Sequence, residues 1–368
     1  MTRAVQQQSF RVVELGTDPG LALCGKWLGA LGGTVLRVDE AGHPMAMRPL
    51  EAAPVNQAEN PLDLYLNAGK ERCTLDLDDA KDRATLAGLL AAADVFITSL
   101  EPARLTELGL DAASLGNHAL TMGRTSLFGD RGAYAGLKGN DLQALALSGL
   151  LYIVGEPDRA PLPLPGVQAS YSAGLALLSG VMVCVWAADR KRAFREIVTS
   201  GVRACAYLDW KSQIYFEAEG KVLVRGSDRG PIVVRCADGY LGFYYRPGDW
   251  ENVKRVIGGT ALNDERFATQ AARDKNRAEL REAMEQELAN RRKAQVYAAS
   301  QAANIPVGEV LSLTETLADK QYDARGFWQE TEIAGHGTCR MPAMPWTVNG
   351  ARQSLNSDAP AVVAGAAQ

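Results

Sequence analysis

The sequence lacks the short motifs that hold nucleotides and metals. The segment GTDPGLALCG at 16–25 does not have the GxGxxG spacing of a dinucleotide-binding turn, and no GxxxxGK[ST] phosphate loop occurs in the chain. The three histidines, His43, His118 and His336, are scattered without metal-ligand spacing. These absences disfavour classical NAD binding, P-loop nucleotide hydrolysis and a histidine metal site, and we expect no metal.

Disulfide scaffolding and secretion signals are lacking as well. The cysteines form no CxxC pair and are too sparse for a disulfide framework. Most of them lie inside apolar stretches, and residues 1–10 lack the apolar core of a signal peptide. We therefore expect reduced core cysteines in a cytoplasmic protein. The cysteines are Cys24, Cys73, Cys184, Cys205, Cys236 and Cys339.

Charge and hydropathy exclude two further classes of partner. The formal net charge is −4, and no Lys/Arg cluster is dense enough to form a nucleic-acid footprint. The longest apolar run, 173–188, is interrupted by Ser179 and Gly180, and its length predicts a buried helix too short to cross a bilayer. Neither nucleic acid nor membrane is an expected partner.

What the first third does contain is an alternation of strand-like and helix-like segments. Strands are predicted at 11–15, 34–38, 73–77, 94–99 and 119–126, and helices at 21–31, 80–93 and near 112. This order predicts an α/β fold with a Rossmann-like parallel sheet covered by helices. In such sheets ligands bind beyond the carboxyl ends of the strands, here after Leu15, Val38, Ser99 and Ser126.

The rest of the chain predicts a second, smaller α+β domain. Helices are expected at 140–150, 171–189, 195–216, 250–257, 275–291 and 294–303, and strands at 222–224, 232–236, 240–245, 327–333 and 341–348. The ADG segment at 237–239 has the composition of a hairpin turn. We assign 1–218 to the large domain, 219–325 to the small domain and 326–368 to a return segment.

The stretch 161–190 combines a proline-rich segment with the longest apolar run of the chain. Pro161, Pro163 and Pro165 predict a stiff, extended entry into an apolar helix. Ser170 stands where an N-cap belongs, with the helix starting at Tyr171. As a cap, Ser170 would be replaceable by aspartate with a loss of stability well below ~1 kcal/mol.

The order of segments resembles the class III (CaiB/BaiF-type) CoA-transferases, the family of formyl-CoA transferase and carnitine CoA-transferase that includes α-methylacyl-CoA racemase. The matching pieces span nearly the whole chain. They include RVVELGTDPGLALCGKWLGALGGTVLRVDE at 11–40, NAGKERCTLDL at 67–77, ADVFITSLEPARLTELGLD at 93–111, NDLQALALSGLL at 140–151 and NIPVGEVLSLTETLADKQYDARGF at 304–327. The resemblance implies a large Rossmann-like domain, a small domain, and two chains interlocked as open rings.

The resemblance also implies a catalytic aspartate that this sequence does not have. Family transferases attack the acyl-CoA thioester with an aspartate and carry CoA as an enzyme thioester. The matching position here is Ser170, and the His–Asp pair of the racemase branch falls on Asn140 and Ser170. Asp141 is a candidate displaced catalytic group, although stabilising the first turn of its own helix is the favoured role.

The predicted CoA contacts depart from the family pattern too. Lys70 and Lys138 match basic positions near the CoA phosphates, whereas Glu40 and Glu107 fall where arginines are common, so we expect weak CoA binding. Residues predicted to line the site are Thr17, Asp18, Pro19, Arg37, Arg72, Ser99, Leu100 and Arg104. Asp228 and Arg229 occupy the place of an active-site lid, with a plain surface turn as the simpler alternative.

The sequence is compatible with two functional hypotheses. In one, the chain is an acyl-CoA enzyme, a transferase or a divergent racemase or lyase that uses other residues. In the other, it is a silent scaffold subunit that pairs with an Asp-bearing homologue. The expected partners are an acyl-CoA, a carboxylic acid and a second chain, identical or homologous, with no tightly bound cofactor.

Overall fold

The structure, a computed structural model, describes residues 10–42, 61–116, 119–188, 193–225, 231–333 and 337–352. The chain forms two compact units. The large unit consists of residues up to Val154, Pro161–Val222 and residues from Arg325 onward, and the small unit of Gly155–Ala160 and Leu223–Ala324.

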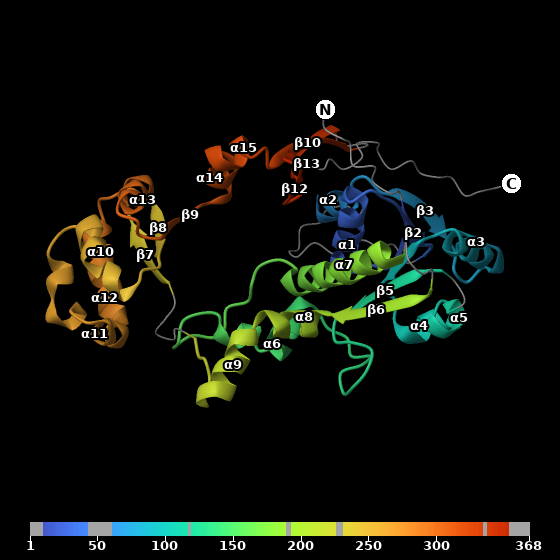
Figure 1. Ribbon diagram of the computed structural model, residues 1–368, viewed down its shortest axis with the longest axis horizontal. Coiled ribbons are helices and arrows are strands. Elements are labelled where there is room, and N and C mark those ends of the chain that lie inside the picture. The colour runs from blue at the N-terminus through green and yellow to red at the C-terminus, as the bar shows by residue number, and fades with distance from the viewer. Residues whose placement is uncertain are drawn as a thin grey trace. The chain divides into compact units, whose positions relative to one another are not determined.

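A parallel sheet of six strands is the centre of the large unit (Figure 1). Its strand order is β3-β2-β1-β4-β5-β6, and every neighbouring pair is parallel. The order reverses between β1 and β4, which makes the carboxyl ends of these two strands the topological switch point. The strands are β1 (Phe10–Leu15), β2 (Gly33–Glu40), β3 (Glu71–Leu75), β4 (Val95–Thr98), β5 (Thr121–Ser126) and β6 (Arg195–Ser200).

Helices cover both faces of this sheet. Val12 and Ile97 pack with α1 and α7, whereas Val13 and Phe96 pack in a separate cluster with residues of α3 and α4. Since both faces of the central strands are buried, these strands read as nearly continuous apolar runs. The helices are α1 (Pro19–Ala30), α2 (Pro61–Asn67), α3 (Ala80–Ala91), α4 (Pro102–Glu107), α5 (Ala112–Leu115), α6 (Asp141–Leu147), α7 (Gln168–Ala188), α8 (Gly201–Leu208) and α9 (Trp210–Glu219), with a 3-10 turn, η2, at Leu150–Ile153.

Two glycines let α1 and α7 touch backbone to backbone. A Cβ at Gly20 would overlap the carbonyl oxygen of Ser170, and one at Gly174 would overlap the carbonyl oxygen of Gly20. Only a residue without a side chain allows this approach. The contact holds the first turns of both helices beside the switch point.

The predicted helix over 195–216 is wrong in its first part. Residues 195–200 form β6, which pairs in parallel with β5 along its whole length, and the helices α8 and α9 follow it. This segment is a strand because it pairs with β5 at the edge of the sheet. Local periodicity does not reveal such pairing. The predicted strand at 222–224 is also absent, since these residues have no regular structure.

The predicted length of the apolar helix needs correction as well. α7 begins at Gln168, and its Gln168–Ala187 stretch, with a mean hydropathy of 1.6, is long and apolar enough to cross a membrane by length and composition. Leu177 and Val181 are fully buried against the sheet, whereas Val183 and Trp186 are exposed. One face of the helix therefore belongs to the core of the large unit.

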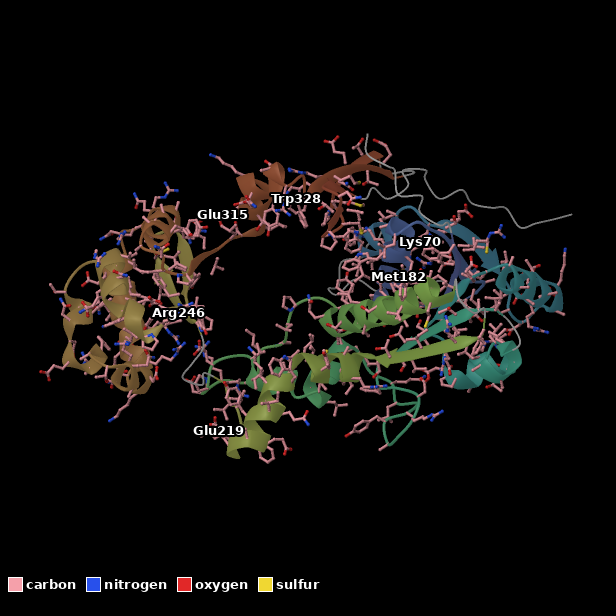
Figure 2. All side chains as sticks on the ribbon, viewed as in Figure 1. Lys70, Met182, Glu219, Arg246, Glu315 and Trp328 are labelled. Atoms are coloured by element: carbon pink, nitrogen blue, oxygen red, sulfur yellow. The ribbon has the colours of Figure 1, made fainter. Side chains whose placement is uncertain are left out.

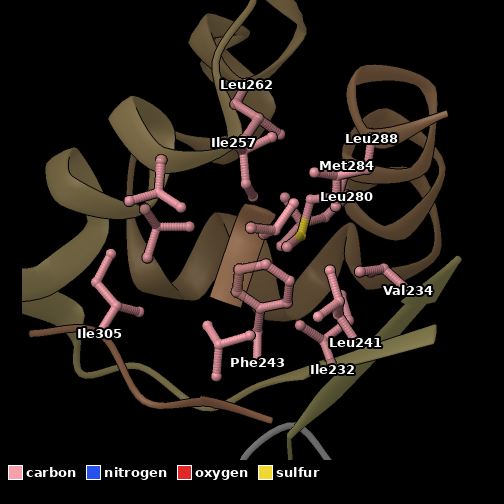
Figure 3. Close-up of a cluster of buried hydrophobic side chains, with 14 of the residues drawn as sticks. Ile232, Val234, Leu241, Phe243, Ile257, Leu262, Leu280, Met284, Leu288 and Ile305 are labelled. Atoms are coloured by element: carbon pink, nitrogen blue, oxygen red, sulfur yellow. The ribbon is translucent and has the colours of Figure 1, made fainter. Parts of the chain in front are cut away.

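The small unit has its own sheet and its own core. β7 (Ile232–Cys236), β8 (Gly239–Phe243) and β9 (Val307–Val310) form an antiparallel sheet, and the predicted turn at 237–239 joins the first two strands. Phe243 lies at the centre of the apolar cluster, between strand residues such as Ile232 and helix residues such as Leu280 (Figure 3). The helices are α10 (Trp250–Ile257), α11 (Gln270–Lys275), α12 (Arg277–Leu288), α13 (Lys293–Ala302), α14 (Leu313–Leu317) and α15 (Lys320–Ala324), with 3-10 turns η3 (Pro247–Asp249), η4 (Ala261–Asn263) and η5 (Glu265–Phe267).

Short strands follow where the chain returns to the large unit. β10 (Trp328–Ile333) pairs antiparallel with β11 (Gly337–Pro342), and β12 (Thr347–Val348) pairs with β13 (Ala351–Arg352). Trp346 packs edge-on against Trp27 of α1, with ring centroids 4.7 Å apart. This contact ties the return segment to the helix that starts at the switch point.

Candidate functional site

A cavity of about 790 Å³ opens at the switch point of the large sheet. Its walls are the segments that follow β1, β4 and β5, together with the first turns of α6 and α7. Of the predicted site residues, the structure brings eight to this cavity: Thr17, Asp18, Pro19, Ser99, Leu100, Asn140, Asp141 and Ser170. A cavity of the large unit therefore lies at the carboxyl ends of the strands, where the sequence predicts a site.

Asp141 and Ser170 form the polar centre of this cavity. Oδ1 of Asp141 accepts hydrogen bonds from the Ser170 hydroxyl at 2.8 Å and from the Ser170 backbone N–H at 3.0 Å. Oδ2 accepts a bond of 2.6 Å from the backbone N–H of Ala169. The Asp141 carboxylate, which belongs to α6, therefore satisfies the free amide groups at the start of α7.

Ser170 is not the N-cap that the sequence predicts. α7 starts two residues earlier, and the N–H of Tyr171 already bonds the carbonyl of Val167 at 2.9 Å, so Ser170 lies inside the first turn. Asp141 stands in for the missing cap from a distant part of the chain, which no local pattern could indicate. Ser170 is 7% exposed.

Asp18 brings a second carboxylate to the cavity. It is the N-cap of α1, with its side chain accepting from the N–H of Leu21 at 3.0 Å. Burial raises the pKa of Asp18 above its usual value, and the nearby charge of Asp141 acts in the same direction. Hydrogen bonds from backbone amides and from the Ser170 hydroxyl oppose the rise. Ser170 thus lies between two aspartates.

The chain's own carboxylates occupy the positive ends of both long helices at the cavity. A helix start favours anions because its N–H groups are unpaired and its dipole is positive there. Asp18 occupies this position for α1 and Asp141 for α7. The amide groups at the two helix starts are therefore already bonded to the chain's own carboxylates. They are not open to attract an anionic group of a substrate.

Asn140 completes the local scaffold. It caps α6, with its side-chain oxygen accepting from the N–H of Leu142 at 3.0 Å, while its backbone N–H donates to Gln143 at 2.8 Å. This capping box fixes the first turn of α6 and with it the direction of Asp141. Asn140 lines the cavity but is engaged in a structural role.

Lys70 belongs to the large unit, where Figure 2 labels it, and its side chain is buried. It does not line the cavity. Its ammonium group pairs with Glu14 at 2.8 Å and also donates to the carbonyl of Ala22 and the side chain of Asn67. Both charged side chains are 1% exposed. Burial lowers the pKa of Lys70 and raises that of Glu14, and attraction within the pair opposes both shifts.

The three predicted arginines are engaged with acidic residues. Arg37, 2% exposed, bonds Asp39 and Asp63, and Arg72 bonds the other oxygen of Asp39 at 2.7 Å. Arg104 pairs with Glu40, Asp78 and Glu107 at 2.8–3.0 Å. The two glutamates that reverse the expected charge are thus partners of Arg104. Sequence reasoning missed Asp63 and Asp78, since no local pattern links them to distant arginines.

The remaining candidates lie elsewhere. Lys138 is exposed and does not line the cavity. His43, His118, His336, Asp228 and Arg229 fall outside the described residues. All six cysteines are free thiols, four of them buried. Within the described ranges, no group of three or more His, Cys, Asp or Glu side chains could hold a metal ion.

Comparisons with known proteins point to one family. The profile of CoA-transferase family III matches residues 8–365. The chain is 28% identical over 339 residues to succinyl-CoA:(R)-benzylsuccinate CoA-transferase subunit BbsE of Thauera aromatica, covering 87% of this chain and 82% of that protein. It is also 28% identical over 345 residues to succinate–glutarate CoA-transferase of Agrobacterium fabrum, covering 88% and 84%.

Solved structures agree at the level of the fold. A CAIB/BAIF family protein from Brucella suis superposes with a TM-score of 0.83 at 24% identity, covering 96% of this chain and 95% of that one. The doubly wound sheet and the family match, which extends over almost the whole sequence, lead to one conclusion. The chain belongs to CoA-transferase family III.

Proposed function

We propose that this chain acts on acyl-CoA thioesters as a subunit of a CoA-transferase assembly, and that its own site lacks the family's nucleophile. One contact carries the proposal: the hydroxyl of Ser170, the residue that the resemblance aligns with the family aspartate, donates a hydrogen bond to Asp141 at 2.8 Å. The named activities of the relatives, CoA transfers between acids, support the substrate class.

The chemistry of a hydroxyl explains why the usual cycle would stop here. A carboxylate that attacks the thioester gives a mixed anhydride and releases CoA thiolate. The thiolate then attacks the enzyme's carbonyl of this anhydride, which gives an enzyme thioester and releases the first acid as its carboxylate. A serine would instead give an ester, which does not exchange readily with CoA. Asp141 is a weak substitute, since three hydrogen bonds already stabilise its negative charge.

The assembly that we propose is a dimer of interlocked rings, formed with a homologous chain that keeps the aspartate. A homodimer is the alternative. The relative from Thauera aromatica is itself named as a subunit, which supports a role inside a heteromer. The six free cysteines are consistent with a cytoplasmic location, which belongs to the same proposal.

Activity assays on the purified chain test this proposal directly. We expect no transfer of CoA from succinyl-CoA or formyl-CoA to any acid by the chain alone, and activity when a homologous chain with the aspartate is co-expressed. Pull-down from the source cells should return such a partner. An enzyme-bound CoA thioester on this chain, seen by mass spectrometry, would disprove the missing nucleophile and direct attention to Asp141.

A second candidate function is proton transfer next to the thioester carbonyl, as in a divergent racemase. The observation in its favour is the pair of aspartates, Asp18 and Asp141, in one cavity, where the raised pKa of Asp18 favours its protonated, acid form. One group could supply a proton and the other remove one.

Exchange of the α-proton of a 2-methylacyl-CoA in deuterated water measures this second activity. We expect Asp18→Asn to abolish any exchange. Asp79→Asn is the matched control, because Asp79 also caps a helix of twelve residues but lies on the exposed surface away from the cavity. Absence of exchange in the unmodified chain would rule out this candidate and leave the first untouched.

A further inference from the structure

The small unit contains a cavity of its own that the CoA-transferase reaction does not explain. Its volume is about 430 Å³, within the range of small-molecule sites. Three arginines, Arg246, Arg273 and Arg277, line it together with a single acidic residue, Asp274. Among its charged side chains, positive charge therefore exceeds negative charge by two, which favours an anionic occupant.

Arg273 is the centre of this cavity. It is 3% exposed, and its guanidinium lies over the ring of Trp250, 4.4 Å from the ring centroid. One terminal nitrogen donates to the carbonyl of Phe267 at 2.8 Å and the other to Gln270 at 3.0 Å. These bonds orient the planar group firmly.

One donor of this buried guanidinium has no acceptor. The Nε–H of Arg273 makes no hydrogen bond, and no carboxylate among the described residues lies within ion-pair distance of the side chain. A buried, unsatisfied N–H on a full positive charge destabilises the fold. An anion in the cavity would compensate the positive charge of this side chain.

The other two arginines stand around the same space. Arg277, at the start of α12, donates from a terminal guanidinium nitrogen to the carbonyl of Pro231 at 2.8 Å. Arg246, in the segment after β8, is exposed and labelled in Figure 2. Three guanidinium groups from three separate segments thus line one cavity.

The rest of the lining is apolar and aromatic. Ile232, Phe243 and Leu280 reach the cavity from the core of the small unit, and Tyr244 and Tyr245 extend from the end of β8. Burial raises the pKa of Tyr245, while the charges of Arg273 and Arg277 and a hydrogen bond with Arg273 oppose this rise. Tyr245 therefore stays a neutral hydroxyl that can donate to a bound anion.

We propose that this cavity is a second ligand site, which binds a small organic anion through a carboxylate or phosphate group held by the arginines. An apolar or aromatic portion of the ligand packs on Phe243, Leu280 and the tyrosines. Every residue that lines the site belongs to the small unit, and none of them lines the switch-point cavity. It does not depend on the proposed transferase role.

Calorimetric titration of the full-length chain with four probes tests the site. Benzoate and phenyl phosphate combine a ring with an anion, inorganic phosphate supplies the anion alone, and benzamide is the neutral match of benzoate. We expect benzoate or phenyl phosphate to bind, inorganic phosphate to bind more weakly, and benzamide not to bind. The tighter of the two aromatic anions identifies the charged group that the site selects.

Variants assign the binding to this cavity. Arg277→Gln and Arg246→Gln should each weaken binding by about tenfold, and Arg273→Gln should weaken it further if that variant folds. Arg255→Gln is the control, since Arg255 is exposed on α10 and outside the cavity. The proposal is overturned if no aromatic anion binds at millimolar concentration, or if binding is equal in Arg277→Gln, Arg246→Gln and the control.

Discussion

At the scale of single residues, the contact between Ser170 and Asp141 decides the character of the candidate site. The serine hydroxyl and two backbone amides of α7 all point at one carboxylate. The same carboxylate is rigidly placed by the cap of its own helix. Both the stability and the chemistry of the site therefore depend on the charge at position 170.

The variant Ser170→Asp should be less stable than the unmodified chain by about 1–3 kcal/mol at neutral pH. The new carboxylate would lie against Asp141, where it would replace the hydroxyl donor of Ser170 by a negative charge. The small loss of stability predicted for a capping residue therefore does not apply. One of the two paired acids would have a raised pKa in the folded state, so the loss should be small near pH 4 and grow as the pH rises.

Thermal unfolding at about pH 4 and about pH 8 measures this effect. Ser170→Asn is the matched control, because it has a similar shape without the charge and should show little dependence on pH. Equal melting temperatures for Ser170→Asp and the unmodified chain at the higher pH would mean that the two carboxylates do not meet. If Ser170→Asp also gained a CoA thioester on incubation with acyl-CoA, the cavity would be competent and only its nucleophile missing.

A second prediction at this scale concerns Asp18. Burial raises the pKa of Asp18 in the folded state above the ordinary value of 3.8. As the pH rises past 3.8, Asp18 therefore loses its proton in the unfolded chain before it does so in the folded chain. This group therefore lowers stability progressively above pH 3.8, up to its raised pKa. Asp18→Asn keeps a capping side chain but removes the ionisation, so we expect the variant to become more stable relative to the unmodified chain as the pH rises.

Urea unfolding at several pH values between about 4 and 8 checks this trend. Asp79→Asn, at the exposed cap of α3, should follow the unmodified chain over the same range. A constant difference between Asp18→Asn and the unmodified chain at all pH values would contradict the raised pKa.

At the scale of elements, the crossing of α1 and α7 positions the site. Asp18 precedes the first turn of α1 and Ser170 lies in the first turn of α7, so any separation of these helices would spread the site residues apart. Gly20 and Gly174 are the two positions that permit the close crossing.

Gly174→Ala should destabilise the chain by about 3 kcal/mol or more, because the new methyl group would overlap the backbone of Gly20, which cannot move aside cheaply. Gly88→Ala is the matched control in another helix. Nothing lies within 4 Å of a Cβ at Gly88, and this variant should gain about 0.5–1 kcal/mol from helix propensity. Opposite shifts in melting temperature are expected, and a neutral Gly174→Ala would contradict the backbone contact.

At the scale of the whole molecule, charge governs the encounter with CoA. The chain has a formal net charge of −4, and around Arg37, Arg72 and Arg104 five carboxylates face three guanidinium groups. The excess of negative charge disfavours the phosphates of CoA in this region.

Calorimetry should therefore detect weak CoA binding or none. In the double variant with Glu40→Gln and Glu107→Gln, Arg104 loses two of its acidic partners, and we expect up to about tenfold tighter binding. A second double variant, Glu265→Gln with Glu282→Gln, neutralises two exposed carboxylates of the small unit and so controls for the change in total charge. Low-micromolar affinity of the unmodified chain for CoA would contradict the expected repulsion.

The sequence alone determined the alternation of strands and helices, because apolar periodicity and capping residues are local signals. Val12, Val13 and Leu15 indicated a strand buried on both faces, and the ADG turn indicated the hairpin of the small unit. The order of segments was sufficient to identify the family. It also predicted a site at the ends of the strands, where the structure has a cavity, since ligand sites of parallel sheets lie there.

Only the tertiary structure decided how the polar groups pair. β6 is a strand because β5 lies beside it, and Lys70 is a buried ion pair because Glu14 faces it, 56 positions away in the chain. Asp141 caps a helix that begins 27 residues later, which moves Ser170 from the cap into the first turn. Such contacts join residues far apart in the chain, and their free energy depends on distance and burial in three dimensions, which local patterns do not encode.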